Sequence, residues 1–322
     1  MQFFKKIKNK SKQNIIQVLL RLKRYKLDES LLIFSEARSG STWLMELFQN
    51  VPGVIVNWEP LHLEKGVVPE NYKFGWRPCL PLNNTKIKYK KLFKRIFRFQ
   101  TCNSWTTQFL KFKDIRYSKY VLTKFVRGNQ LLPWVVNTFP NLKYRPILLL
   151  RHPITTCVSR LKTFDKMTSQ NILSLKNEGN FIIPDCINNQ RFLKHQNYLN
   201  NLKTKLEVEI AVWCINNVNI LNHKNNNKWM VVFYEDLVLD PEKTFKAVLK
   251  GLNINLLSEL LKKIEFRKAS ASNFDNQLKS KPQEQLESVF KNFNNDELLN
   301  IQAIFDYFEL KVYSAFNSYP IK

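Results

Sequence analysis

The chain has 322 residues, long enough for one domain with a sizeable hydrophobic core, and its 51 lysines and arginines against 26 aspartates and glutamates give a formal net charge of +25 at pH 7. So basic a surface predicts anionic partners, namely nucleotides, acidic polysaccharides, anionic lipids or nucleic acid, and does not choose among them. The five cysteines are odd in number and lack Cys-x-x-Cys spacing, which argues against a zinc site and against a dense disulfide framework.

Residues 1–30 are predicted to form a basic extension in front of the domain. The longest apolar cluster in this region, residues 15–20, is far shorter than the roughly 20 residues that a membrane-spanning helix requires. The region also lacks the small-residue cleavage site of a signal peptide. We therefore expect a protein without a membrane anchor and favour the cytoplasm. The alternative is a basic helix that lies on a membrane surface.

The first strongly patterned segment is a strand, a turn and a helix. Residues 31–36 are a predicted strand that starts as a short apolar run. The Arg-Ser-Gly-Ser-Thr turn follows at 38–42, and an amphipathic helix is predicted over 42–50. Such a turn is an anion cradle, because free backbone N–H groups and the positive end of the helix dipole point at one spot. Arg38 adds a permanent charge and the hydroxyl groups of the turn add donors. The turn therefore predicts a phosphate-like ligand.

This turn departs from the P-loop of ATP- and GTP-binding proteins. That motif has a longer glycine-rich loop ending in Gly-Lys-Ser/Thr, where the lysine reaches the terminal phosphates and the hydroxyl binds magnesium. Here there is one glycine, Gly40, and no lysine precedes Ser41 and Thr42. A P-loop kinase or nucleotide hydrolase is therefore the rival interpretation.

Ionisable residues follow the next two predicted strands. Residues 54–57 are the second strand, and Glu59 and His62 come shortly after it. Residues 120–126 are the third strand, with Lys124 near its end. Ligands of open α/β sheets bind at the carboxyl ends of the strands, so we expect these side chains beside the first turn.

Two long segments, near 63–118 and 165–195, separate the predicted elements. We expect the first to be irregular and basic, and both to carry acceptor specificity, because loops around a fixed site carry function. Within the first, residues 86–98 repeat apolar side chains at helical spacing among many cations. We expect a helix that packs on the core with a solvated lysine face. Contact with an acceptor or a membrane surface is the alternative.

The second anion motif follows a continuous apolar run at 146–150, which is typical of a strand buried on both faces of a parallel sheet. Arg151 follows directly, and Pro153 suits the first turn of a helix predicted over 154–162. Ser159 lies about two turns along that helix. An arginine and a serine that converge at the carboxyl end of a strand suit a second phosphate.

The remainder continues the alternation, with a helix near 200–222, a strand at 229–234, and helices near 242–251, 256–264 and 295–310. Strands alternating with helices imply right-handed βαβ units and an α/β, three-layer fold with a central, mainly parallel sheet flanked by helices. We expect residues 31–322 to form one domain. At the end of the late strand, Tyr234, Glu235 and Asp236 are expected to cap the next turn and tie the core together.

Taken together, these motifs resemble the sulfotransferases that use 3′-phosphoadenosine-5′-phosphosulfate (PAPS). The 38–42 turn with Trp43 resembles their 5′-phosphosulfate loop, and the segment from Arg151 to Ser159 resembles their 3′-phosphate motif, with His152 where an aspartate is common. Further segments are similar to family motifs at 57–62, 120–127 and 229–237. The likeness is greatest to carbohydrate 6-O-sulfotransferases.

The resemblance implies a P-loop-like fold and transfer of the sulfuryl group from PAPS to a hydroxyl of a carbohydrate or glycoconjugate, without a metal or a specific nucleic acid partner. A non-carbohydrate hydroxyl is an alternative acceptor, and a non-enzymatic module that binds polyanions or membranes is an alternative function. The residues that match the cofactor motifs are Arg38, Ser39, Gly40, Ser41, Thr42, Trp43, Arg151 and Ser159.

The catalytic candidates implied by the resemblance are Glu59 as general base, with Arg38 and Lys124 as charges on the transferring group. His62 is the rival base because an unperturbed imidazole titrates near neutral pH. An apolar site would raise the pKa of Glu59 and remove that advantage. The alternative role of Glu59 is a structural ion pair with Arg38 or Lys124.

Overall fold

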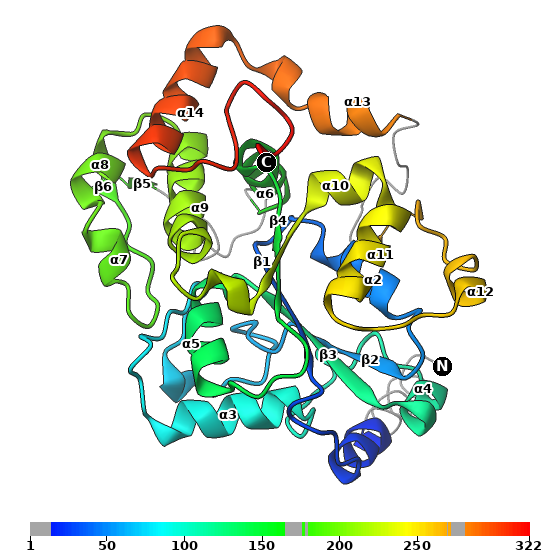
Figure 1. Cartoon of the computed structure of the whole chain (residues 1–322). Coiled ribbons are helices and arrows are strands. Elements are labelled where there is room, and N and C mark those ends of the chain that lie inside the picture. The colour runs from blue at the N-terminus through cyan, green and yellow to red at the C-terminus, as the bar shows by residue number, and fades with distance from the viewer. Residues whose placement is uncertain (1–13, 165–175, 178–179, 269, 272–280) are drawn as a thin grey trace, which may run out of the picture.

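The computed structural model describes residues 14–164, 176–177, 180–268, 270–271 and 281–322 (Figure 1). Its centre is a sheet of five strands, all parallel, in the spatial order β2-β3-β1-β4-β7. The strands are β1 (Leu31–Ser35), β2 (Val54–Trp58), β3 (Tyr120–Val126), β4 (Ile147–Leu150) and β7 (Met230–Phe233). The α/β class and the parallel sheet predicted from the sequence are confirmed.

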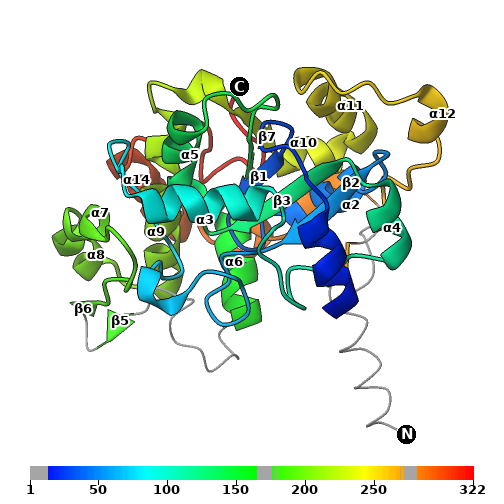
Figure 2. The same cartoon turned by 90° about the horizontal axis from the view of Figure 1, so that it is seen from below.

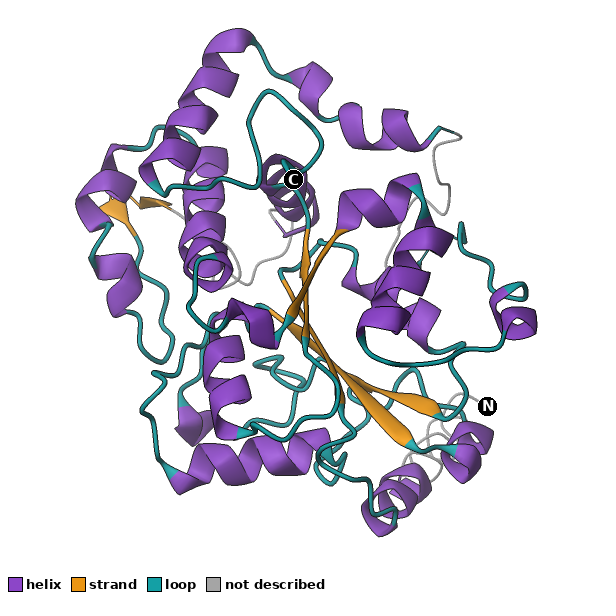
Figure 3. Cartoon of the chain, viewed as in Figure 1, coloured by secondary structure: helices purple, strands orange, loops and turns teal. Residues whose placement is uncertain are grey.

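Helices cover both faces of this sheet (Figure 3). They are α2 (Ser41–Phe48), α3 (Ile87–Phe97), α4 (Phe112–Tyr117), α5 (Leu132–Thr138), α6 (Pro153–Phe164), α7 (Gln190–Leu193), α8 (Gln196–Asn201), α9 (Lys205–Leu221), α10 (Tyr234–Leu239), α11 (Pro241–Gly251), α12 (Ser258–Leu261), α13 (Pro282–Glu287) and α14 (Asn295–Tyr307). Short 3₁₀ turns lie at Glu70–Tyr72, Asn129–Leu131, Asn226–Lys228 and Phe290–Asn292, and a hairpin pairs β5 (Lys176–Asn177) with β6 (Asn180–Phe181).

The apolar run of β1 is continuous because both of its faces are covered. Leu31 and Ile33 pack in the cluster that α2 and α11 complete, and Leu32 and Phe34 pack in the larger cluster that includes α3, α5 and α9. Successive side chains of a strand point to opposite faces, so a strand buried on both sides shows no alternation of polarity. The ring of Phe34 stacks on that of Phe125 in β3, with centroids 4.8 Å apart.

The strand order reverses direction at β1. The chain passes from β1 to β2 at the sheet edge, returns to β3, and then crosses to β4 on the other side of β1. In open α/β sheets the crevice for ligands lies outside the carboxyl ends of the strands at such a reversal. The segments that leave β1, β3 and β4 therefore define where a site belongs.

An N-terminal helix runs through residues 14–22 and is drawn unlabelled in dark blue in Figure 1. Its Ile16 and Leu20 are fully buried, in a cluster with Ile55 of β2 and Val121 of β3. The second half of the predicted basic extension therefore packs on the edge of the sheet.

The long segment at 63–118 is not wholly irregular, because it contains α3 and α4. The amphipathic helix expected within 86–98 is confirmed as α3, whose apolar stripe from Tyr89 to Phe97 is buried and whose lysines are exposed, while Ile87 at its start faces solvent. Helix α4 was missed because six residues are too few for a helical period. A local contact marks its start, since the Asp114 carboxylate accepts from the Lys111 backbone N–H at 3.0 Å.

The later segments differ from expectation mainly in helix length. The helices expected near 256–264 and 295–310 are shorter in the structure, at α12 and α14. Helices α7, α8 and α13 each span four to six residues and were not predicted. Of the expected acceptor segment at 165–195, residues 165–175 and 178–179 lie outside the described residues.

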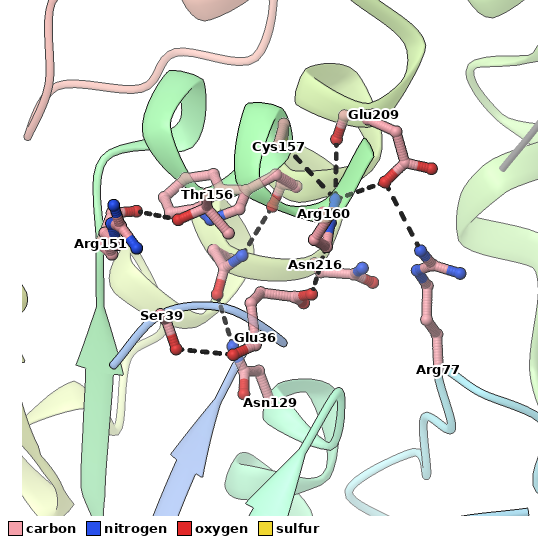
Figure 4. Close-up of polar contacts among 12 residues, drawn as sticks. Glu36, Ser39, Arg77, Asn129, Arg151, Thr156, Cys157, Arg160, Glu209 and Asn216 are labelled. Carbon is pink, nitrogen blue, oxygen red and sulfur yellow. Dashed lines mark hydrogen bonds and ion pairs between the residues drawn. The ribbon is translucent and has the colours of Figure 1, made fainter. Parts of the chain in front are cut away.

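A buried network of charges joins the helices to the end of β1 (Figure 4). The Arg160 guanidinium on α6 donates to the Glu36 carboxylate at 2.7 Å and also to the carboxylate of Glu209 on α9. Arg77 lies 3.9 Å from the same Glu209 carboxylate. All four side chains are at most 2% exposed. Because Glu36 comes directly after β1, this network fixes α6 and α9 relative to the turn that follows.

Replacing Arg160 by methionine is expected to destabilise the protein strongly. The change leaves two buried carboxylates without their main partner, which typically costs about 3–5 kcal/mol of unfolding free energy. Denaturant unfolding measures it. The matched control is Lys246→Met, which breaks an exposed pair with Glu242 and should cost less than about 0.5 kcal/mol. Equal losses in the two variants would contradict the assigned role of the network.

Candidate active site

The turn between β1 and α2 has the geometry of an anion cradle. Arg38 and Gly40 both have left-handed backbones, with φ of 70° and 85°. Ser39 between them donates its hydroxyl to the Glu36 carbonyl at 2.6 Å. Gly40 is the N-cap of α2, and no side chain of the described residues caps that end of the helix. The first N–H groups of α2 are therefore available to an anion.

Gly40 cannot be replaced by a larger residue without a shift of its surroundings. A Cβ atom there would lie 2.3 Å from the ring of Tyr234, and a positive φ strains any side chain. Tyr234 comes directly after β7, and its ring also carries the Arg151 guanidinium at 4.5 Å from the centroid. Sequence reasoning gave Tyr234 only a capping role. Tyr234 follows the carboxyl end of β7, the strand that pairs with β4. That position could have predicted that Tyr234 lies beside the anion turn.

Arg38, Arg151 and Ser159 meet at this turn. The Arg38 Nε atom donates to the Ser159 hydroxyl at 3.1 Å, and an Arg151 Nη1 atom donates to the Arg38 carbonyl at 2.9 Å. Arg151 also donates from Nε to the Thr155 hydroxyl at 3.1 Å. Its backbone carbonyl accepts the Thr156 hydroxyl at 3.2 Å, a contact drawn in Figure 4. The two motifs that the sequence placed more than a hundred residues apart thus form one cationic surface around the N-terminus of α2.

Lys124 joins the turn to the carboxylate that follows β2. Its Nζ atom lies 2.7 Å from Glu59 Oε1 and 3.3 Å from the Thr42 hydroxyl, and 3.5 Å from the centroid of the Trp58 ring. The Lys124 side chain is 2% exposed and that of Glu59 is 16% exposed. The alternative of an ion pair between Glu59 and Lys124, open from the sequence, is therefore realised in the structure.

The ion pair sets the protonation state of Glu59. Burial by itself raises the pKa of this carboxyl, but the charge and hydrogen bond of Lys124 outweigh it, with help from Arg127, so the pKa lies below its ordinary value of 4.5. The upward shift that an apolar site would have produced is not found. Glu59 is accordingly a carboxylate at neutral pH, and its second oxygen has no partner among the described residues.

His62 is held as a neutral donor. Burial lowers its pKa below 6.5, and its Nδ1 atom accepts the backbone N–H of Lys65 at 3.3 Å. An imidazole that accepts at Nδ1 carries its proton on Nε2. Its free nitrogen therefore presents a hydrogen-bond donor rather than a proton acceptor.

Aromatic rings from the 63–118 segment surround His62. The rings of Trp76 and Trp105 lie 4.8 Å and 5.0 Å from the imidazole centroid, and the Arg127 guanidinium lies over Trp76 at 4.7 Å. The buried indole N–H groups of Trp58 and Trp105 have no acceptor within the described part of the chain. Sequence analysis did not connect these tryptophans with the site. Because Trp76 and Trp105 lie in loops, no periodic pattern linked them to Glu59.

Three residues that follow strands are held in left-handed conformations. Arg38, Glu59 and Arg127 come after β1, β2 and β3, with φ of 70°, 37° and 60°. For residues other than glycine this conformation costs about 1–3 kcal/mol each and is concentrated at functional sites. The three strained residues follow neighbouring strands, so they lie at the carboxyl edge of the sheet, where the Lys124–Glu59 ion pair also lies.

His152 has the structural role that the sequence left open. It is fully buried before α6, its Nδ1 accepts the Ile154 N–H at 3.2 Å, and its Nε2 donates to the Ser314 carbonyl at 3.0 Å. Its backbone N–H donates to the Glu235 carboxylate, which also accepts the Tyr313 hydroxyl. The imidazole thus caps α6 as an aspartate would, and Glu235 ties the core together as expected.

A cavity of about 830 Å³ lies beside the outer face of α2, where Trp43, Glu46 and Lys268 line it together with residues of α4. None of Arg38, Glu59 and Arg151 lines this cavity, so it is separate from the cationic surface. The Trp43 indole donates to the Phe266 carbonyl at 3.1 Å.

Within the described residues, no cluster of His, Cys, Asp and Glu side chains could hold a metal ion, and no helix is long and apolar enough to cross a membrane.

Residues 28–299 match the family model of the sulfotransferase domain. No curated protein matches the chain in sequence. Similar solved structures include mouse sulfotransferase SULT7A1 complexed with PAP, at 15% identity, 91% and 89% coverage of the two chains and a TM-score of 0.48. The sulfotransferase domains of the curacin biosynthetic pathway and of the Synechococcus PCC 7002 olefin synthase are also 15% identical. The match to the curacin domain covers 87% of this chain and 96% of that domain, with a TM-score of 0.43. The match to the olefin synthase domain covers 88% of this chain and 95% of that domain, with a TM-score of 0.44.

The buried neutral His152 predicts a loss of stability at acid pH. Burial lowers its pKa to about 3, whereas in the unfolded chain it titrates near 6.5. Between these values the unfolded state binds one more proton, so the free energy of unfolding falls with falling pH by about 1.4 kcal/mol per pH unit from this group.

Replacing His152 by asparagine should remove that slope, because the amide oxygen can still accept the Ile154 N–H but cannot take a proton. Denaturant unfolding at a series of pH values between 3 and 6.5 measures it. His195→Asn is the control. Burial also lowers the pKa of this partly exposed histidine, but its variant keeps His152 and should retain most of the slope. An unchanged slope in His152→Asn would show that His152 is not the group responsible.

Proposed function

The chain belongs to the sulfotransferase family, and we propose that it transfers the sulfuryl group of PAPS to a hydroxyl group of a carbohydrate or glycoconjugate. The observation that supports the donor is the meeting of Arg38, Arg151 and Ser159 at the N-terminus of α2. Two cationic motifs at one strand edge suit a nucleotide with anions at both its 5′ and 3′ positions. ATP carries its phosphates in one chain and has no group for the second motif.

The residues divide between the two anions of the donor. The turn from Arg38 to Trp43 would hold the 5′-phosphosulfate on its free N–H groups, and Lys124 hydrogen-bonds the Thr42 hydroxyl within that turn. Arg151 and Ser159 would hold the 3′-phosphate. Arg38 and Lys124 would stabilise the negative charge that grows on the leaving phosphate oxygen, because fixed charges in a site shielded from water act strongly.

Glu59 is the general base of this proposal. Its carboxylate is ionised at neutral pH, and Lys124 connects it to the anion turn. An acceptor hydroxyl that approached the sulfuryl group at this turn would come close to Glu59. His62 presents N–H toward its surroundings and would orient the acceptor as a hydrogen-bond donor. Bound PAPS supplies the sulfuryl group, and the chain supplies position, positive charge and the acceptor for the proton.

The aromatic surroundings of Glu59 support a sugar as the acceptor. The partly exposed rings of His62 and Trp105 offer apolar surface against which the C–H face of a sugar ring can pack, and the buried ring of Trp76 supports His62. The buried indole N–H groups of Trp58 and Trp105 lack an acceptor among the described residues, and a hydroxyl oxygen that reached them would satisfy them. A site that combines aromatic faces with donors suits a polyhydroxylated ring better than a flat, apolar phenol.

The nucleotide assignment predicts that adenosine 3′,5′-bisphosphate binds much more tightly than 5′-AMP. Arg151→Ala should erase most of that preference, because losing a charge-assisted contact to phosphate costs about 1.5–3 kcal/mol. Isothermal titration calorimetry measures both affinities. Arg145→Ala, at the opposite end of β4, is the matched control and should keep the preference. Equal affinity of the parent protein for the two nucleotides would overturn the second phosphate site.

Turnover that vanishes with EDTA would favour a kinase.

The base assignment predicts that Glu59→Gln lowers kcat by roughly 10²-fold or more while nucleotide affinity changes little. His62→Ala should have a mild effect. Because the pKa of Glu59 is lowered, the acid limb of the pH–rate profile should lie below pH 4.5. Transfer of labelled sulfate from PAPS to a panel of glycans measures the rates.

Two outcomes would contradict this assignment. If His62→Ala abolishes turnover while Glu59→Gln only weakens nucleotide binding, the histidine is the base and Glu59 holds the loop. If a panel of alcohols and phenols is sulfated and no glycan is, the acceptor class is wrong while the donor assignment stands.

A further inference from the structure

The N-terminal helix has an apolar stripe that faces solvent. Its Ile15, Val18 and Leu22 are 52%, 53% and 72% exposed. Spacings of three and four residues place them on one side of the helix. The neighbouring side, with Ile16 and Leu20, is fully buried against the sheet edge. The helix is thus apolar toward the core and apolar again toward solvent.

Helix α3 carries a dense set of cations without acidic partners. Within the described residues no ion pair joins any of them to a carboxylate, and the sequence from 71 to 113 contains no aspartate or glutamate at all. The opposite face of α3 is buried, so the helix cannot turn these side chains inward. The exposed cations are Lys86, Lys88, Lys90, Lys91, Lys94 and Arg95.

The two helices that carry these features lie on one face of the molecule. Figure 1 shows both helices along the lower edge, and Figure 2, seen from below, shows both toward the viewer. The segment that follows the N-terminal helix is bonded to the end of α3, since Arg98 donates to the Tyr25 carbonyl at 3.0 Å and Ser30 donates to the Phe97 carbonyl at 3.2 Å. We call the stripe and the α3 cations together the basic-apolar face.

We propose that the basic-apolar face docks on a membrane surface that contains anionic lipid. Exposed apolar side chains of a helix enter the boundary between headgroups and acyl chains, and neighbouring lysines and arginines bind the lipid phosphates and carboxylates. Arg21 and Arg24 add two exposed cations beside the stripe itself. This property is independent of the sulfuryl transfer proposed above.

The exposed apolar stripe favours anionic lipid over other anionic partners. A hydrated acidic polysaccharide would engage the cations but leave Ile15, Val18 and Leu22 in water, so it gives no account of their exposure. A second copy of the chain would bring two strongly cationic faces together, which like-charge repulsion disfavours. Only a surface that is anionic at its headgroups and apolar beneath them matches both halves of the face.

The test uses the full chain in co-sedimentation with vesicles of phosphatidylcholine alone and of phosphatidylcholine mixed with phosphatidylserine. Binding should require phosphatidylserine and weaken with added salt. Val18→Asn/Leu22→Asn, which leaves the charge unchanged, should weaken vesicle binding by about tenfold or more because insertion is lost. Leu299→Asn is the matched control, since Leu299 is 51% exposed on α14 at the opposite edge of Figure 1.

A second pair of variants tests the cations. Lys90→Glu/Lys94→Glu on the exposed face of α3 should also weaken vesicle binding by at least about tenfold, since each basic side chain near the surface contributes about fivefold. Lys243→Glu/Lys250→Glu on α11 carries the same charge change outside the face. Retention on heparin should fall in the α3 variant and stay unchanged in the stripe variant, because only lipid uses the stripe.

The proposal is overturned if the stripe variant binds phosphatidylserine vesicles as tightly as Leu299→Asn does, or if the parent protein binds both vesicle types equally. Heparin retention without vesicle binding would instead make the face a polysaccharide site. Thermal unfolding of each variant, expected to match that of the parent because the changed side chains are exposed, shows that a loss of binding is not a loss of fold.

Discussion

The buried guanidinium of Arg160 is the interaction on which the anion turn depends. It holds Glu36, which directly follows β1, and it holds Glu209 on the long helix α9 at the same time. A buried charge that keeps two partners in place fixes the relative position of every element that carries them, because any displacement leaves a charge without compensation. The turn that begins two residues later therefore starts from a fixed point, with Ser39 bonded back to the Glu36 carbonyl.

The residues at the carboxyl edge of the sheet have strained backbone conformations. Each of the left-handed backbones at Arg38, Glu59 and Arg127 is unfavourable by itself, and each persists because the strand before it is held by pairing on both sides or by packing. Strain of this kind turns side chains of neighbouring strands toward a common point. The ion pair of Glu59 with Lys124 and the packing of Arg127 on Trp76 are results of this arrangement.

The parts that sequence analysis predicted well are those with a continuous or periodic apolar signal. The runs before Glu36 and Arg151 marked β1 and β4 because both faces are buried, and the positions of Arg38 and Arg151 followed from the rule that strand ends meet at one edge. Trp76 and Trp105 could not be placed in this way, since their loops reach the site through tertiary contacts alone. The capping role of His152 was equally hidden, because it depends on a carbonyl at Ser314 that no local pattern connects to it.

That last contact makes the anion site depend on the C-terminal segment. His152 and Ser314 are 162 residues apart in the chain, and Glu235 and Tyr313 are 78 apart. Arg151 directly precedes His152, so its position at the sheet edge relies on contacts made by residues 313 and 314. A nucleotide that binds only when this edge is complete would therefore stabilise the attachment of the C-terminal segment as well as the anion turn.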